Sequence, residues 1–330
     1  MRRLDEDDVR VRPGRGSRPR TRNRPAHESA VTGFVVAVDR GRYRVVLGSG
    51  EVTAMKAREL GKGSVVVGDR VALAGDISGV DGSLARIVRI EPRTSALRRS
   101  ADDTDPVERV LVANADQMVI VSSLVSPGLR FVDRCLVAAY DAGVAPLLVL
   151  TKGDLATESD RRRVRAVYRP LGVTMISTRK PLPAVTLGRL RSALAGKVSV
   201  FIGHSGVGKS TLVNVLVPDA YRAVGEVNAV TGRGRHTSSS VVAFPFGADG
   251  WIIDTPGLRG FGVGNVSPSR LVEAFEDLAE GVVDCPSGCD HLEDGCPLDS
   301  WAAERGLSAR LDSLRRLLAS RAGEFGSNGA

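Results

Sequence analysis

The order of two short strings constrains this chain more than any other feature: TKGD at residues 151–154 precedes GHSGVGKST at residues 203–211. The second string matches the phosphate-binding pattern G-x-x-x-x-G-K-[ST]. An apolar run precedes it at Val198–Ile202, and a helix is predicted over Ser210–Val217, ended by Pro218. The alternative is a glycine turn that matches the pattern by chance. The predicted strand before the loop and the predicted helix after it argue against that alternative. The pattern therefore predicts an α/β domain that binds a phosphate-bearing ligand.

The glycine-rich loop supplies three kinds of group to such a ligand. Its glycines let backbone N–H groups approach phosphate oxygens closely. Lys209 is predicted to reach the β- and γ-phosphates during catalysis, and the Ser210 hydroxyl to bind Mg²⁺. The predicted nucleotide contacts are Gly203, His204, Ser205, Gly206, Val207, Gly208, Lys209, Ser210 and Thr211.

TKGD follows another apolar run, Ala145–Leu150, at the carboxyl end of a predicted parallel strand, where doubly wound sheets bind ligands. Asp154 is predicted to accept hydrogen bonds from guanine, with Lys152 along the base and Gly153 between them; an exposed turn is the alternative. Thr151 stands where this motif usually has asparagine, so one contact is expected to be lost. In ordinary GTPases the phosphate loop comes first. The reversed order predicts a circularly permuted P-loop GTPase domain with a doubly wound sheet.

A third motif, DTPG at residues 254–257, follows the apolar run Trp251–Ile253. Asp254 is predicted to hold Mg²⁺ through water, and the N–H of Gly257 to contact the γ-phosphate. Leu258 follows, where Ras-like enzymes carry the glutamine that orients the attacking water. Another group of this chain, or a partner, must therefore orient the water.

The string GRGRHTSSS at residues 232–240 lies between the phosphate loop and DTPG, in the position of a first switch. Thr237 is the predicted Mg²⁺ ligand of the GTP state, with Ser238 as the alternative. His236 is a candidate catalytic group that would orient the water. A solvated loop histidine or an RNA contact explains His236 equally well.

GHSGVGKST, GRHT, DTPG and the upstream KxD motif resemble the ribosome small subunit-dependent GTPases, a circularly permuted family that matures the 30S subunit. The resemblance runs from about residue 31 to residue 320. It implies GTP hydrolysis to GDP coupled to late 30S maturation, with the subunit and its rRNA as partners. It also implies a base-contacting loop at Ser177 and Thr178, after the predicted strand Val173–Ile176. A P-loop ATPase acting on nucleic acid, and an RNA-binding module with a structural nucleotide, are the alternatives.

Three of the four cysteines stand in CPSGCDHLEDGC together with a histidine, the Cys₃His set typical of a closed structural Zn²⁺ site. A redox pair or inert thiols are the alternative. The resembling family carries a similar knuckle with two slightly longer spacings. Cys135, in a predicted helix Phe131–Ala142, is expected to be a packed core thiol. The predicted zinc ligands are Cys285, Cys289, His291 and Cys296.

The N-terminal part divides into two regions of different composition. Residues 1–30 combine arginines with proline and glycine, which predicts a disordered arm that either binds RNA phosphates or only aids solubility. Residues 31–95 contain short β-branched runs at 31–38, 43–47, 65–73 and 84–90, which predict a small RNA-binding barrel. An OB-fold is the preferred fold, partly on the family resemblance, and an SH3-like barrel is the alternative.

The remaining boundaries place the GTPase domain at residues 96–281 and a helical zinc-binding domain with a tail at 282–330. One amphipathic helix is predicted over Trp301–Ser320, with leucines docked on the GTPase domain and Arg305, Arg310, Arg315 and Arg316 as candidate RNA contacts. The formal charge of +8 favours an RNA or ribosome partner. Sparse cysteines and the lack of a long apolar run favour a cytoplasmic protein that contacts no membrane, and we expect a monomer.

Overall fold

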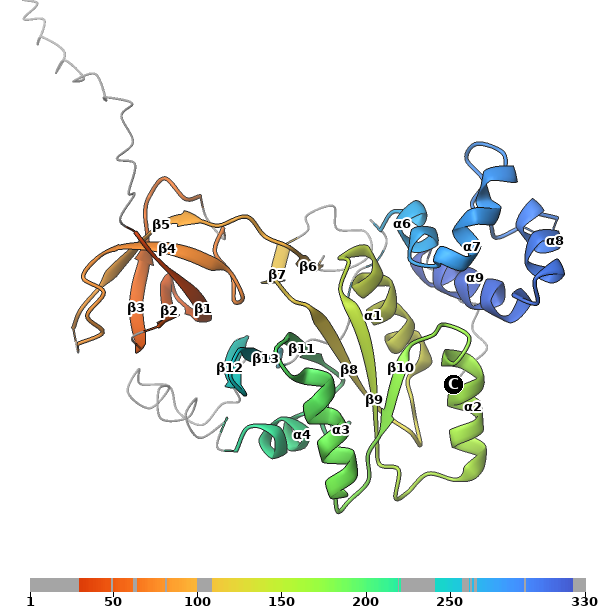
Figure 1. Cartoon of the computed structure of the whole chain (residues 1–330), viewed down its shortest axis with the longest axis horizontal. Coiled ribbons are helices and arrows are strands. Elements are labelled where there is room, and N and C mark those ends of the chain that lie inside the picture. The colour runs from red at the N-terminus through yellow and green to blue at the C-terminus, as the bar shows by residue number, and fades with distance from the viewer. Residues whose placement is uncertain are drawn as a thin grey trace, which may run out of the picture.

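The computed structural model describes residues 30–48, 50–61, 64–80, 82–99, 109–218, 220, 241–256, 261, 263, 266–293 and 295–322. A β-barrel, a sheet with helices on both faces and a group of short helices follow one another along the chain (Figure 1). The predicted N-terminal arm lies outside the described residues.

The barrel closes because its first strand pairs with both the second and the fourth. The strands are β1 (Val31–Asp39), β2 (Arg42–Leu47), β3 (Gly50–Lys56), β4 (Arg70–Gly75) and β5 (Ala85–Ile90). They pair in the order β1-β2-β3-β5-β4 and back to β1, with β3 and β5 parallel. Alternate side chains such as Val35, Val45 and Ile87 fill the interior. This five-stranded closed order confirms the predicted OB-fold.

The central sheet runs β10-β9-β8-β11-β13-β12, and its first five strands are parallel. The strands are β8 (Gln117–Ser123), β9 (Ala145–Thr151), β10 (Thr174–Ser177), β11 (Val198–Ile202), β12 (Val242–Phe246) and β13 (Gly250–Asp254). Strand β8 is buried along its whole length, as a central parallel strand covered on both faces requires. A separate hairpin, β6 (Ala96–Arg99) and β7 (Arg109–Ala113), links the barrel to this sheet.

Helices cover both faces of the sheet, which confirms the doubly wound α/β class. Helices α1 (Leu129–Asp141) and α2 (Glu158–Tyr168) contribute to one core, and α3 (Ala184–Leu194) and α4 (Lys209–Leu216) contribute to the other. Strand β9, which leads into TKGD, precedes β11, which leads into the phosphate loop, and both belong to one sheet. The reversed motif order is therefore a property of one domain.

The barrel and the central sheet are joined by direct contacts. Ala37 of β1 pairs with Val242 of β12, and the rings of Phe34 and Trp251 stack with centroids 4.6 Å apart. Gly68 has a φ of +91°, and a Cβ there would lie 2.0 Å from the Ala113 carbonyl oxygen. Only glycine permits this approach of the barrel to the end of β7.

Of the C-terminal helices, the first and the last pack against α1. In chain order, the C-terminal helices are α6 (Pro268–Glu273), α7 (Glu276–Ala279), a 3₁₀ helix (Glu280–Asp284), α8 (Pro297–Glu304) and α9 (Ser308–Ala322). The prediction of one helix from Trp301 was wrong, because α8 ends at Glu304 and Gly306 has a φ of +67°, which a continuous α-helix excludes. Leu311, Leu314 and Leu318 are buried in the core that contains α1, as predicted for docking.

The structure confirms one further prediction and adds a strand that the sequence analysis did not predict. Cys135 is fully buried in α1, and burial raises the pKa of its thiol, which confirms a core role. Strand β3 was missed, because Ala54, Met55 and Lys56 weaken the β-branched signal there. No helix in the described part of the chain is long and apolar enough to cross a membrane.

Candidate nucleotide and metal sites

Three predicted motifs meet at the carboxyl edge of the central sheet. TKGD begins at the end of β9, the phosphate loop follows β11, and DTPG begins at the end of β13. Parallel pairing aligns these strand ends, since β8 joins β9 to β11 and β11 pairs with β13. Open α/β sheets bind ligands at this edge.

The phosphate loop adopts a conformation that its glycines allow. Gly206 and Gly208 have φ values of +78° and +96°, and Gly208 caps the N-terminus of α4. A Cβ at Gly203 would lie 2.6 Å from the Val121 carbonyl oxygen, so the loop leaves the sheet in close contact with β8. The N-terminus of α4 follows directly, with the exposed Ser210 and Thr211 in its first turn.

Lys209 and Asp254 face each other at the start of α4 and the end of β13. Their side chains form an ion pair and are 8% and 4% exposed. The Thr255 hydroxyl donates to the Phe201 carbonyl at 2.8 Å, which fixes the start of DTPG beside β11. Lys209, predicted to bind the phosphates, and Asp254, predicted to hold Mg²⁺, therefore lie next to each other in a buried part of the site.

The TKGD turn is bonded to the phosphate loop and to the loop after β10. The Thr151 hydroxyl donates to the Val207 carbonyl, so threonine supplies one link between the two motifs. The Gly153 N–H donates to the Thr178 carbonyl at 2.9 Å, and a Cβ at Gly153 would lie 2.8 Å from that oxygen. Ser177 and Thr178 thus lie against TKGD, where the family resemblance places a base-contacting loop.

Asp154 lies at the exposed end of this turn. Its carboxylate accepts a hydrogen bond from the Lys180 N–H at 3.0 Å, and this bond holds its pKa below the usual range. Lys152 is exposed beside it, with a φ of +58°. An ionised carboxylate at this position is an acceptor for the N–H groups of a guanine base.

Several predicted site residues lie outside the described residues: His236, Thr237, Ser238, Gly257 and Leu258. Their roles in water activation, Mg²⁺ binding and γ-phosphate contact stay predictions.

Helix α1 contacts the nucleotide site in two places that the sequence did not indicate. The ring of Phe131 lies 4.0 Å, centroid to centroid, from the ring of His204 in the phosphate loop. The Arg134 guanidinium donates to the Phe261 carbonyl, with Nε at 2.8 Å, in the segment after DTPG. These contacts join segments far apart in the chain, so no local motif signals them.

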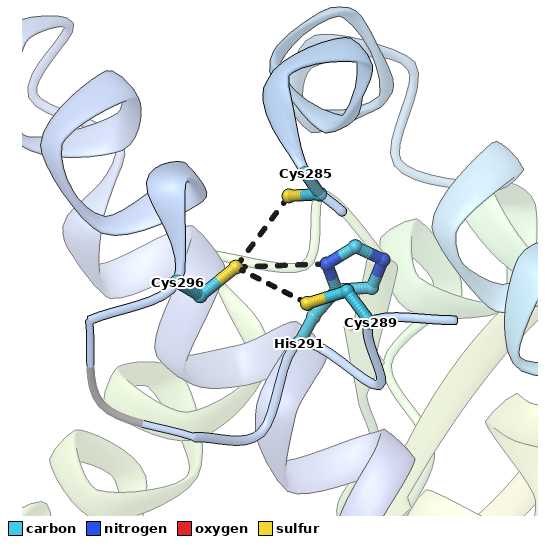
Figure 2. A group of neighbouring side chains, drawn as sticks. All are labelled: Cys285, Cys289, His291 and Cys296. Atoms are coloured by element: carbon cyan, nitrogen blue, oxygen red, sulfur yellow. Dashed lines mark hydrogen bonds between the residues drawn. The ribbon is translucent and has the colours of Figure 1, made fainter. Parts of the chain in front are cut away.

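The four predicted zinc ligands converge in the C-terminal helical region (Figure 2). Cys296 Sγ lies 3.5 Å from Cys285 Sγ, 3.7 Å from Cys289 Sγ and 3.7 Å from His291 Nδ1. Thiolates at about 2.3 Å from a tetrahedral Zn²⁺ would stand about 3.8 Å apart, whereas a disulfide needs about 2.05 Å. The cluster therefore fits a four-coordinate metal ion and does not fit a disulfide.

Hydrogen bonds from Arg315 hold the loop and the helix that carry this cluster. Arg315 of α9 donates from Nε to the His291 carbonyl at 2.8 Å and from Nη1 to Asp299 at 2.7 Å. Burial, and after it the neighbouring Cys296 thiol, raise the pKa of Cys285 to about 12, because a thiolate is poorly solvated there and lies beside another sulfur atom. A divalent cation would reverse that preference, so the donor set suits a metal.

The sheet, its permuted motifs, the OB barrel and the Cys₃His cluster define a circularly permuted P-loop GTPase. The family model for the RsgA GTPase matches residues 90–264. The chain belongs to the RsgA GTPase family, and it is a GTP hydrolase.

Relatives and solved structures agree with this assignment. The "Small ribosomal subunit biogenesis GTPase RsgA" of Pseudomonas aeruginosa is 37% identical over 297 residues, covering 88% of this chain and 85% of that protein. The protein of the same name from Nitrosomonas europaea is 36% identical over 289 residues, covering 86% and 88%.

Among solved structures, YjeQ from Thermotoga maritima superposes with a TM-score of 0.65 at 24% identity, covering 89% of this chain and 99% of that one. YloQ, described as a circularly permuted GTPase, gives a TM-score of 0.64 at 23% identity, covering 92% and 99%. These two structures support the fold.

Proposed function

We propose that this chain hydrolyses GTP to GDP and phosphate as a switch in late maturation of the small (30S) ribosomal subunit. One observation carries the proposal: the TKGD turn, which resembles a guanine-binding motif, is hydrogen-bonded to the phosphate loop although it precedes that loop in the chain. The relatives at 37% and 36% identity, which bear the name small ribosomal subunit biogenesis GTPase, extend it to the small ribosomal subunit.

In the proposed reaction, the phosphate loop and Lys209 hold the β- and γ-phosphates, and Asp154 selects guanine. The residues that would hold Mg²⁺ are Ser210, Thr237 and, through water, Asp254. Mg²⁺ supplies charge neutralisation on the phosphates when bound. Lys209, which lies beside Asp254, is placed between the carboxylate proposed to hold Mg²⁺ and the loop proposed to hold the phosphates.

The ribosomal subunit completes the site in this proposal. The chain docks with GTP, the subunit sets the positions of His236 and of the residues around Leu258 for catalysis, hydrolysis follows, and the GDP form leaves. DTPG lies near the end of the GTPase domain, so its movement would act on the C-terminal helices that follow.

The proposal also covers the oligomeric state, the domains and the metal ion. The chain acts as a cytoplasmic monomer, the barrel at residues 31–95 contacts rRNA, and residues 96–281 form the GTPase domain. Zn²⁺ is the proposed ion of the Cys₃His cluster in residues 282–330, because thiolates and imidazole in a closed tetrahedral set favour it. There it would hold the fold together rather than take part in the chemistry.

Turnover of GTP and ATP by the purified protein, with and without small ribosomal subunits, tests the proposal. We expect GTP-selective hydrolysis that rises sharply with the subunit, and a loss of roughly 100-fold or more in Lys209→Ala. Asp154→Asn should remove the preference for GTP. Equal use of ATP by the unaltered protein, or indifference to the subunit, would contradict the proposal and favour an ATPase acting on nucleic acid.

A further inference from the structure

Positive charge is concentrated in one stretch of this chain. Residues 161–218 contain eleven lysines and arginines and no aspartate or glutamate, whereas the whole chain has an excess of eight positive charges. The rest of the chain is therefore net acidic. The basic character that suggested an RNA partner belongs to the GTPase domain and not mainly to the barrel or to the C-terminal helices.

The first part of this stretch, from α2 to α3, builds one edge of the central sheet, and β11 and α4 follow it nearer the middle of the sheet. Strand β10 is the terminal strand of that sheet, with α2 contributing to the core on one face and α3 to the core on the other (Figure 1). We call the exposed cations here the basic edge, defined by Arg162, Arg165, Arg169, Arg179, Arg189 and Arg191.

Three of these arginines lie along one face of α2. Arg162, Arg165 and Arg169 are spaced three and four residues apart, so they stand on one side of the helix at intervals of about 4.5 Å and 6 Å along its axis. Among the residues that the structure describes, no carboxylate pairs with any of the three. A row of unneutralised guanidinium groups is suited to a partner with regularly spaced negative charges.

A groove of about 490 Å³ opens beside this row, between α2 and α9. Arg165 and Arg169 line one side, and Leu307 and Arg310 line the other. No large apolar side chain is exposed along α2 itself, whereas Leu155 before it and Val185 of α3 are exposed. Protein interfaces usually have an apolar centre depleted of charge, which α2 does not offer.

The basic edge also adjoins the predicted guanine site. Arg179 and Lys180 directly follow Ser177 and Thr178, and the Lys180 N–H bonds the Asp154 carboxylate. A partner held at Arg179 would therefore lie next to the loop that contacts TKGD.

We propose that the basic edge binds the phosphate backbone of RNA, with Arg165 and Arg169 holding phosphates at the groove between α2 and α9. This inference rests on the proposed function, since the RNA is that of the small ribosomal subunit. It places RNA on the GTPase domain at the C-terminal end of α2, whereas the start of this helix contacts TKGD through the bond from Arg161 to the Gly153 carbonyl.

The test compares two full-length variants that each lose two exposed positive charges. Arg165→Gln/Arg169→Gln changes the basic edge, and Arg270→Gln/Arg305→Gln is the control on the C-terminal helices. Affinity for small ribosomal subunits is measured over a range of salt concentrations. A slope near −0.9 per phosphate contact corresponds to about fivefold in affinity per contact at 0.15 M salt. The edge variant should therefore bind roughly 25-fold more weakly, with a salt slope shallower by about 2, and hydrolyse GTP normally without subunits.

The control variant should stay within about twofold of the unaltered protein. Equal affinity of the edge variant and the unaltered protein would overturn the inference while leaving the proposed function intact. If the unaltered protein ignores the subunit, the proposed function fails, and a synthetic RNA duplex replaces the subunit as the probe. Equal binding of that duplex by both variants would overturn the inference as well.

A photo-crosslinker at Ala166, which lines the groove, identifies the class of partner on the subunit. Crosslinks to rRNA support the inference. Crosslinks confined to ribosomal protein would overturn it.

Discussion

Three arginines of helix α9 and three arginines at helix α2 differ in whether the fold gives them a carboxylate partner. On α9, Arg310, Arg315 and Arg316 each pair with a carboxylate of another element, namely Asp277, Asp299 and Asp133. On α2, Arg162, Arg165 and Arg169 have no carboxylate partner among the described residues. The number of arginines in a helix thus says little about its role. We infer that the carboxylates brought to each arginine by the fold decide whether it stabilises the protein or is left available to a partner.

The difference has a physical basis in burial. Asp133 is 2% exposed on α1, so its charge requires a partner, and Arg316 also donates to the Val167 carbonyl. The guanidinium of Arg310 lies over the Phe275 ring, 4.7 Å from its centroid. These contacts fix α9 to the GTPase domain, which leaves little of its charge for RNA and disfavours the role that the sequence suggested for these arginines.

The largest effect is expected from removing the metal ion that we propose for the Cys₃His cluster before α9. Cys296→Ser, or a strong chelator, should cost several kcal/mol of the free energy of unfolding, because ion binding and folding of this segment are coupled. The metal content of each sample is determined, and urea unfolding measures the free energy of unfolding. Chelator added to Cys296→Ser should have no further effect, and unchanged stability after verified metal loss would show that the cluster is not structural.

Removing one arginine from each helix tests the comparison next. Arg316→Met leaves the buried Asp133 carboxylate without its partner and should destabilise the protein by about 3 kcal/mol. Arg165→Met should change stability by less than about 0.5 kcal/mol, because its side chain is exposed and unpaired. Urea unfolding of the two variants checks this, and Asp133→Asn should restore part of the loss in Arg316→Met. Equal effects of the two substitutions would show that the α9 ion pair is not the source of the difference.

A smaller effect concerns pH. Burial raises the pKa of Asp133, and Arg316 opposes that rise, so losing Arg316 should raise the pKa further. A carboxyl with a raised folded-state pKa contributes stability that is fully present below its unfolded pKa, about 3.9, and lost as pH rises through the folded value. The deficit of Arg316→Met should therefore be smallest near pH 4 and grow toward pH 7. Unfolding at several pH values tests this, and a constant deficit would indicate lost packing instead of an unpaired charge.

The predictable parts of this protein are those that a short string encodes. The phosphate loop, TKGD and the Cys₃His cluster each need particular residues at fixed spacing, so the sequence located them. The break between α8 and α9 was missed because the regularly spaced leucines begin only at Leu307, so they do not indicate whether a helix continues back across Gly306. The pairing of Asp133 with Arg316 joins residues 183 positions apart, and only the packing of α1 on α9 brings them together.

Association with the small ribosomal subunit in two nucleotide states tests the central claim most directly. The purified protein is sedimented with small subunits in the presence of a non-hydrolysable GTP analogue or of GDP. The account predicts that the protein sediments with the subunit in the GTP-analogue state and is largely released with GDP. Equal association in both states would contradict a GTP-dependent switch on the small subunit.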